Sequence, residues 1–409
     1  MMNDVAIAGT AMTRFGKFPA ATIRTLAEEA VRGALADARM SAADVGMVFF
    51  SNAVAGVITG QEMIRGQVAL RHTGLLGKPI VNVENACASA STAFHLAVGA
   101  VASGSVDVAL AVGSEKLTHP DKTRSFAAIG TAVDLFQIDE LKRWTRGESA
   151  GSPLPMEAED DDSKRSFFMD VYAANTRAYM KASGATVEDF AEVAVKSHAH
   201  AALNPHAQYR SPVTVEQVLA SRTVAHPLTL LMCSPIGDGA AAVVVCSADR
   251  ARRNGLDPVR VRASVLVSGT DHAPDEPGSV ERASALAYER AGIGPEDLDV
   301  LEVHDAAAPA ELMTYEELGL CPAGSGPALL RSGATCLGGR HVVNPSGGLL
   351  AKGHPIGATG CAQLVELADQ LRGRCGGRQV AGARTALAEN GGGFLATDTA
   401  AMAVTVLSV

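Results

Sequence analysis

One cysteine lies where nucleophilic chemistry is favoured. Cys87 stands in Val-Glu-Asn-Ala-Cys-Ala-Ser-Ala-Ser, residues 83–91, between an apolar run and an Ala-rich helical pattern. The free N–H groups and positive dipole at a helix start favour a thiolate, which is the form that attacks carbonyl carbons. A single cysteine acts in this way only if the fold brings a histidine to it, and a small buried cysteine is the alternative.

Two histidines are candidates for that partner. His354 lies in the glycine-rich stretch 344–360, and glycine lets backbone approach a substrate closely. His304 follows the short apolar run 300–303, which predicts a buried strand. Catalytic side chains often lie just beyond strand ends. For His304, a His-Asp pair that caps a helix or stabilises a turn is the alternative.

The chain repeats itself. Residues 27–49 and 281–303 both predict a helix, an acidic turn and a strand. Residues 79–83 precede the Cys87 junction as 341–345 precede the His354 loop, and each is followed by a helix. Internal repeats define a fold more strongly than single elements do. We therefore expect two similar α/β halves related by a pseudo-twofold axis, with strand ends converging on one cleft.

Four motifs give the chain a resemblance to the thiolases over nearly its whole length. Residues 85–89, Asn-Ala-Cys-Ala-Ser, resemble the family's nucleophile motif, and residues 347–360 resemble its Gly-Gly-His motif. Residues 234–242 resemble the Asp-Gly-Ala-Ala turn before a strand. His304-Asp305 resembles the His-Asp-Cys-Phe motif of the sterol carrier protein-type thiolases. The resemblance implies an α/β thiolase fold, a duplicated five-layer αβαβα arrangement with an inserted loop domain.

The expected domains follow from that resemblance and from changes of composition. Residues 1–118 and 225–250 form the N-terminal half, and residues 258–409 form the C-terminal half. The loop domain, residues 119–224, is more polar and in thiolases helps to bind coenzyme A. Its acidic run, residues 157–162, indicates a solvated surface because like charges repel and stay hydrated.

A second catalytic cysteine is missing. Thiolases use one as acid and base at the substrate α-carbon, but the two places where the family carries it hold Asn390 and Ala306 here. Neither side chain transfers protons at neutral pH. Cys375-Gly-Gly matches the Cys-x-Gly form in which many thiolases carry this cysteine, but its basic, glycine-rich surroundings predict a turn. We therefore expect slow proton removal from an acetyl group unless His304 serves as the base.

The resemblance implies a role for each remaining group. Cys87 forms the acyl-enzyme, His354 takes its proton and helps to polarise the thioester, and His304 donates to the oxyanion of the second step. The backbone N–H groups of Cys87 and Gly392 form the other oxyanion hole. The residues expected to bind substrate are Ser234, Gly353 and Asn390.

Composition agrees with this interpretation. The 409 residues are 47% hydrophobic and only 4% aromatic, which predicts a large aliphatic core. A net charge of −9 argues against nucleic-acid and anionic-membrane partners. Seven cysteines without paired spacing indicate reduced thiols and a cytoplasmic location. We expect no metal site, because no Cys-x-x-Cys or His-x-x-x-His pair occurs. His198 and His200 are a weak exception, since side chains two residues apart on a helix diverge. We also expect no leader peptide or membrane span.

The sequence therefore predicts a thiolase-like acyltransferase that uses an acyl-CoA as substrate, with no resident cofactor. The resemblance implies a homodimer or a dimer of dimers. A thiolase-fold aldolase or lyase of steroid or fatty acyl-CoA side-chain breakdown is the first alternative. Such lyases pair with a small acyl-CoA-binding protein of OB-fold and zinc-ribbon type. A non-catalytic acyl-CoA- or lipid-binding subunit of a complex is the second alternative.

Overall fold

The computed structural model describes residues 4–148, 165–273, 276–395 and 397–409. Their main feature is a ten-stranded sheet with the order β10-β9-β11-β12-β8-β1-β7-β4-β2-β3. The first half supplies β1 (Val5–Met12), β2 (Met47–Ser51), β3 (Ile80–Val83), β4 (Val108–Lys116) and β7 (Asp238–Ser247). The second half supplies β8 (Val259–Ser268), β9 (Val300–Glu302), β10 (Val342–Val343), β11 (Thr385–Gly392) and β12 (Ala401–Ser408).

This strand order confirms the duplication. Within each half the strands follow the same spatial order, and the two halves meet where β1 pairs antiparallel with β8. The repeated segments also match locally. α1 (Ile23–Asp37), a 3-10 turn and β2 correspond to α11 (Ser279–Ala291), a 3-10 turn and β9.

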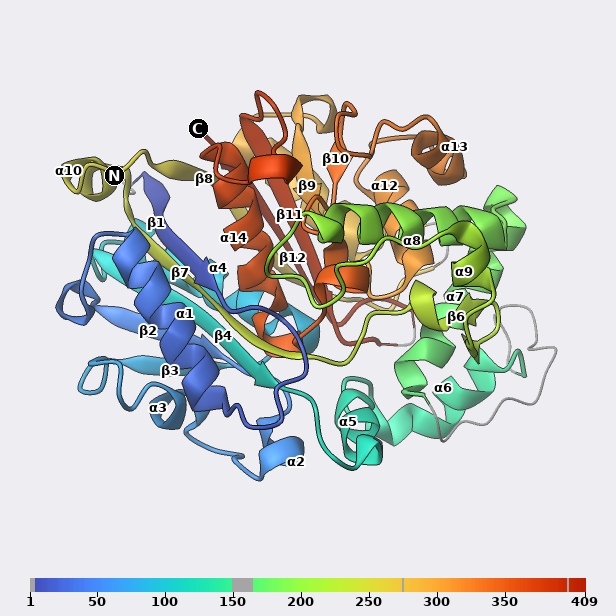
Figure 1. Ribbon diagram of the computed structural model, residues 1–409, viewed down its shortest axis with the longest axis horizontal. Helices are drawn as coiled ribbons and strands as arrows, with labels where there is room; N and C mark the ends of the chain where they lie inside the picture. Colours follow the sequence, from blue (N-terminus) through green and yellow to red (C-terminus); the bar gives the residue numbers. More distant parts are fainter. Residues whose placement is uncertain (1–3, 149–164, 274–275, 396) are drawn as a thin grey trace.

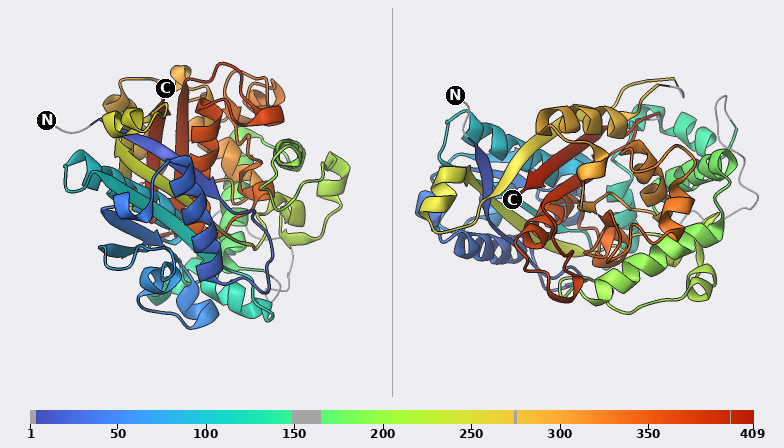
Figure 2. Two further views of the ribbon diagram at one scale, coloured as in Figure 1. Left: turned by 60° about the vertical axis from the view of Figure 1, so that its left-hand side comes forward. Right: turned by 90° about the horizontal axis from the view of Figure 1, so that it is seen from above.

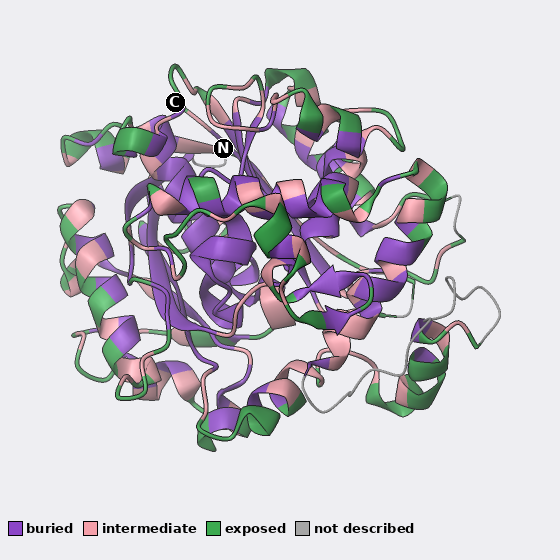
Figure 3. Cartoon of the chain, turned by 45° about the vertical axis from the view of Figure 1, so that its right-hand side comes forward, coloured by how far each residue is buried: buried purple, intermediate pink, exposed green. Residues whose placement is uncertain are grey.

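Each half of the sheet packs helices on both of its faces, because side chains alternate along each strand. The two halves share the central helices, so the fold has five layers. In the first half Phe50 and Val112 pack with α1, whereas Phe49 and Ala111 face the other way. That second face meets α4 (Ser89–Ala102) and α14 (Thr359–Leu371), which lie between the two halves of the sheet. The outer face of the second half packs with α11 and α12 (Ala308–Glu317). Figures 1 and 2 show this layering, and Figure 3 shows that the strands and central helices are largely buried.

The inserted segment packs over one end of the halves. It contains α5 (Lys122–Ile129), α6 (Ile138–Thr145), α7 (Phe167–Ser183), α8 (Val187–Ala202) and α9 (Val215–Leu219), with the hairpin β5 (Thr223–Ala225) and β6 (Leu228–Thr229) after them. The hairpin spans the expected boundary between residues 224 and 225, and the domain limits stay predictions. The acidic run, residues 157–162, lies outside the described residues. The remaining helices are α2 (Ala55–Thr59), α3 (Arg65–Ala69), α10 (Ala248–Arg253) and α13 (Gly326–Arg331).

Asp238 holds the chain where it leaves the sheet for the inserted segment. This fully buried carboxylate accepts hydrogen bonds from the backbone N–H groups of Leu117, at 2.9 Å, and Thr118, at 2.8 Å. Lys116 Nζ lies 2.6 Å from it. Because a buried charge is stable only when it is paired and hydrogen-bonded, this cluster explains the Asp-Gly-Ala-Ala motif.

Among the described residues, no helix combines the length and apolar character needed to cross a membrane.

The glycine-rich loop before α14 is pinned to the end of β9. It begins at Gly347 and forms a π-helical turn over Gly348–Lys352. Asp305 Oδ1 accepts the backbone N–H of Leu349 at 2.6 Å. Gly348 has φ of 60°, and a Cβ there would lie 2.1 Å from Asp305 Oδ2. Only glycine fits this approach, so the loop that carries His354 depends on it.

We predict that Gly348→Ala destabilises the chain more than Gly373→Ala does. Gly373 also has a positive φ, 68°, but a Cβ there meets nothing within 4 Å. Both alanines lose about 1–2 kcal/mol to the left-handed conformation, and Gly348→Ala loses roughly 1–3 kcal/mol more through overpacking. Denaturant unfolding of both variants measures the difference. Equal losses would contradict the close approach.

Candidate active site

Cys87 lies in a tight turn between β3 and α4. The turn is a 3-10 helix, Ala86–Ala88, and Ala86 has φ of 47°, which is uncommon for a residue other than glycine. The glycines at the end of β11 allow this turn to come close, since a Cβ on Gly392 would lie 2.2 Å from the carbonyl oxygen of Asn85. The thiol therefore lies at a helix start, as the sequence predicts.

The helix start does not make Cys87 a thiolate at rest, contrary to what its position favours. Burial, and then the negative charges of Glu115 and Glu84, raise the pKa of Cys87 to about 12. The backbone N–H groups of Cys87 and Gly393 act in the opposite direction but are outweighed. Loss of hydration penalises the charged form more than the helix dipole favours it. Cys87 therefore needs a base to become a nucleophile.

His354 is held as a hydrogen-bond acceptor toward the cavity. It is 7% exposed, and its Nδ1 lies 2.7 Å from Thr359 Oγ1. The Thr359 hydroxyl donates to the carbonyl of Pro355 at 3.1 Å, so it accepts from Nδ1–H of the imidazole. Nε2 then carries the lone pair, and it is a buried atom without a hydrogen-bond partner. Burial, together with the charges of His304 and Lys352, lowers the pKa of His354 well below its usual value.

His304 is held in the opposite tautomer. Ser91 Oγ donates to Asn390 Oδ1 at 2.7 Å, which leaves the Asn390 amide N–H to donate to His304 Nδ1 at 2.9 Å. The proton of the neutral ring is therefore on Nε2. Burial lowers the pKa of His304 to about 4, so the ring is uncharged at neutral pH. The two histidines thus differ in function: one accepts a proton and the other donates a hydrogen bond.

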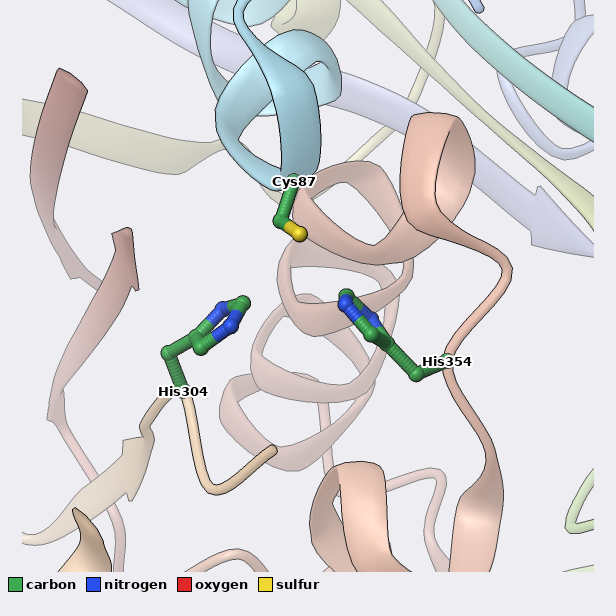
Figure 4. A group of neighbouring side chains, drawn as sticks. All are labelled: Cys87, His304 and His354. Atoms are coloured by element: carbon green, nitrogen blue, oxygen red, sulfur yellow. The ribbon is translucent and has the colours of Figure 1, made fainter. Parts of the chain in front are cut away.

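These three side chains converge from three separate segments. The Cys87 sulfur and one nitrogen each of His304 and His354 all lie within 4.8 Å of one another. The imidazole centroids are 5.1 Å apart, and their planes cross at 89°. Figure 4 shows Cys87 pointing from the start of its helix toward the space between the two rings. This arrangement suits attack of a sulfur on a carbonyl with a base on one side and a donor on the other.

The trio opens into a cavity of about 1060 Å³. Both halves and the inserted segment line it, and Ser234, Gly392 and Ala306 are among the lining residues. Its walls also carry the basic side chains of Lys17, Arg65, Lys122, Arg165 and Arg222. A cavity of this size, with apolar walls and a few charged groups, fits a large thioester.

Two residues that the sequence assigns to substrate binding stand behind the cavity wall. Asn390 is 1% exposed, and its amide is hydrogen-bonded to Ser91 and His304. Gly353 does not line the cavity either, and its φ of 108° serves the loop before His354. In this structure the Asn390 amide positions His304, and Gly353 shapes the loop, whereas a role of either residue in substrate binding stays a prediction.

A further cysteine and two histidines that the sequence analysis considered do not join the trio. Cys375 is buried beside Glu366, with its Sγ 3.6 Å from the carboxyl Oε1, and it does not line the cavity. His198 and His200 diverge on α8: their Nδ1 atoms contact the carbonyls of Ser211 and Asn344. The expectation that no metal is bound stays a prediction.

Sequence reasoning missed two buried carboxyl groups near the site. Glu115 accepts the backbone N–H groups of Ala53 and Gly357 at 2.9 and 3.0 Å and so holds the His354 loop to β4. Glu389 lines the cavity and accepts the backbone N–H of His304 at 2.8 Å. Burial raises the pKa of each to about 7. The one available signal was an acidic residue within an apolar strand.

The duplicated layers and the cysteine–histidine trio define an α/β protein with a thiol at its candidate active site. Comparison with protein-family models matches both halves of the chain to one family. Residues 5–249 match the model described as thiolase, N-terminal domain, and residues 271–405 match the thiolase C-terminal domain-like model. The chain belongs to the thiolase family.

Similar proteins cover nearly the whole chain. The acetyl-CoA acetyltransferase of Methanothermobacter thermautotrophicus is 39% identical over 96% of this chain and 97% of its own length. Human sterol carrier protein 2 is 36% identical over 95% of this chain and 70% of its own length. Among solved structures, the Ltp2-ChsH2(DUF35) aldolase aligns with a TM-score of 0.78 and 26% identity, over 99% of this chain and 98% of the other.

We predict that Thr359→Val slows acylation of Cys87 by about fivefold. Valine keeps the shape of the side chain but removes the hydroxyl that accepts Nδ1–H of His354, and one such hydrogen bond contributes about 1 kcal/mol. Thr359→Ser, which keeps the hydroxyl, is the matched control and retains most of the rate. Stopped-flow release of the thiol product measures both. Unchanged acylation in the valine variant would mean that Thr359 does not set the tautomer.

Proposed function

We propose that this chain is an acyl-CoA acyltransferase that forms an acyl-enzyme on Cys87 and passes the acyl group to a carbon or thiol acceptor. The observation that carries this proposal is the convergence of the Cys87 sulfur and one nitrogen of each imidazole within 4.8 Å, with one ring held as an acceptor and the other as an N–H donor. The acetyl-CoA acetyltransferase relative supports the same class of reaction.

The first half-reaction uses His354 as the base. Its Nε2 takes the thiol proton of Cys87 as the sulfur attacks the thioester carbonyl. Backbone N–H groups of Cys87 and Gly392 stabilise the oxyanion. The intermediate then collapses, the bond to the coenzyme A sulfur breaks, and that sulfur takes the proton from the imidazolium. The neutral resting state of all three groups fits this order of steps.

The second half-reaction uses His304 as the donor. A nucleophile attacks the acyl carbon on Cys87, the carbon–sulfur bond breaks, and the released sulfur takes up the proton that the acceptor loses. When the acceptor is a carbon, the Nε2–H of His304 stabilises the negative oxygen of its enolate. Asn390 keeps that proton on Nε2 through its bond to Nδ1. The basic side chains along the cavity are suited to the phosphates of coenzyme A, which we propose as part of the substrate and not as a resident cofactor.

An aldolase is the second candidate function. It is favoured by the similarity to the Ltp2-ChsH2(DUF35) aldolase and by the absence of a second cysteine from both motif positions. That neighbour's name joins two proteins, so this candidate brings with it a partner protein, for which the resemblance to thiolase-fold lyases implies the small acyl-CoA-binding type. A carbon–carbon lyase does not need the Cys87 thiol, and a non-catalytic subunit needs none of the trio. Acylation of Cys87 separates the three candidates.

We predict that acyl-CoA adds one acyl mass to Cys87 and that the two histidines affect different steps. His354→Ala slows this acylation by roughly 10² to 10⁴, the usual worth of general-base catalysis. His304→Ala spares acylation and slows transfer of the acyl group to its acceptor. Intact-mass and peptide mass spectrometry follow the first step, and product formation follows the second.

Cys87→Ala is the control and removes the label. Cys321 and Cys336 are the internal references, because they are also partly exposed free thiols. Label found mainly on either of them would contradict the assignment of the nucleophile. Equal loss of both steps in both histidine variants would show that the two roles are not separate.

We further propose a homodimer, or a dimer of dimers, in the cytoplasm. β3 is an edge strand of the sheet, and apolar side chains around it are exposed: Met63 by 75%, Ile64 by 60% and Val81 by 40%. A free sheet edge flanked by apolar surface favours pairing with a second copy.

We predict that light scattering gives at least twice the chain mass and that Val81→Lys lowers the measured mass, because a charged side chain on the edge strand disfavours pairing. A native monomer would contradict the proposal.

A further inference from the structure

Glu389 is a carboxyl group placed at the reacting centre. It is 2% exposed yet lines the cavity, and it lies within β11. Side chains alternate along this strand: Ala388 belongs to the central cluster and Leu387 to the outer one. Asn390 therefore points into the central layer, toward Ser91, and Glu389 points to the opposite face with Leu387. The two neighbours reach His304 from different sides.

The contacts of Glu389 place it beside the trio. Its Oε2 accepts the backbone N–H of His304 at 2.8 Å, and among the described residues Oε1 has no side-chain hydrogen bond. Tyr172 of α7 also lines the cavity, and burial, followed by the proximity of the ionisable groups of Cys87 and Glu389, raises the pKa of its hydroxyl. The thiol, the phenol and the carboxyl group thus lie close enough to influence one another's ionisation.

The surroundings suit a carboxyl group that exchanges protons. Burial raises the pKa of Glu389 to about 7, while the N–H of His304 acts in the opposite direction. His304 contacts Glu389, and Tyr172 of α7 and Glu317 of α12 lie near enough to feel its charge, which helps to raise the pKa of Glu317 to about 8. These neighbours are neutral or acidic. A general base works best when its pKa lies near the working pH.

We propose that Glu389 removes the α-proton of the second acyl-CoA, the task for which thiolases use their second cysteine. This proposal rests on the proposed function. It replaces the expectation, based on Ala306 and Asn390, that the chain lacks an effective base for this step. The motif comparison missed Glu389 because the group lies one residue before the expected position and on the opposite face of the strand.

The step balances without another reactant. The carboxylate takes the proton from the α-carbon, and the C–H electron pair forms the enolate, whose oxygen accepts a hydrogen bond from Nε2–H of His304. The α-carbon then attacks the acyl carbon on Cys87, and the carbon–sulfur bond breaks. The proton held on Glu389 returns to the Cys87 sulfur, which restores the resting thiol and carboxylate.

Exchange of the acetyl methyl protons of acetyl-CoA in deuterated water tests this proposal. In the native chain we expect exchange whose rate rises with pH and levels off above about pH 7, because the ionised carboxylate is the base. Glu389→Gln keeps the shape and the acceptor for the His304 N–H but removes the basicity. We expect it to slow exchange by roughly 10² to 10⁴, while acylation of Cys87 by His354 changes far less. Glu389→Asp keeps a carboxyl group and retains part of the exchange.

Three outcomes are distinguishable. Exchange at the native rate in Glu389→Gln would overturn the assignment of the base. Native acylation of Cys87 without any methyl exchange would overturn it as well. If Cys87 takes up no acyl group, the proposed function fails, but methyl exchange by the native chain and its loss in Glu389→Gln would still support Glu389 as the base, because proton removal does not need an acyl-enzyme. Thermal melting of both variants checks that they are folded.

Discussion

Removal of water from three reactive side chains is the constraint on which the rest of this structure depends. Burial raises the pKa of the Cys87 thiol and lowers the pKa of both imidazoles, so all three groups are uncharged at neutral pH. A resting ion pair between thiolate and imidazolium, which a helix start alone would favour, is therefore absent from the site. Activation of the thiol becomes a proton transfer that accompanies attack on the substrate.

Because the two rings are both neutral, hydrogen bonds behind them decide what each can do. The Thr359 hydroxyl accepts from one ring and the Asn390 amide donates to the other. The same residue type thus supplies a base on one side of the thiol and a donor on the other. The Asn390 side chain is a fixed part of this arrangement, which is why it stands behind the cavity and not in it.

Buried carboxyl groups hold the loops that carry these rings. Glu115 accepts a backbone N–H of the His354 loop, Asp305 accepts another, and Glu389 accepts that of His304. A buried carboxyl group is costly unless it is hydrogen-bonded, and a loop is imprecise unless its backbone is held. Each of these contacts both hydrogen-bonds a buried carboxyl group and holds the backbone of a loop. Glu389 differs from the other two because it also faces the cavity.

The sequence by itself determined the duplicated fold and the three principal residues. The repeated helix–turn–strand segments, the Cys87 junction and the glycine-rich loop are local patterns, and duplication brings their strand ends together. The tertiary structure alone decided the charge of the thiol, since burial depends on the whole fold, and the tautomer of His304, since its partner Asn390 lies 86 residues away along the chain. It also separated Asn390 from Glu389, because alternation along one strand sends adjacent side chains to opposite faces of the sheet.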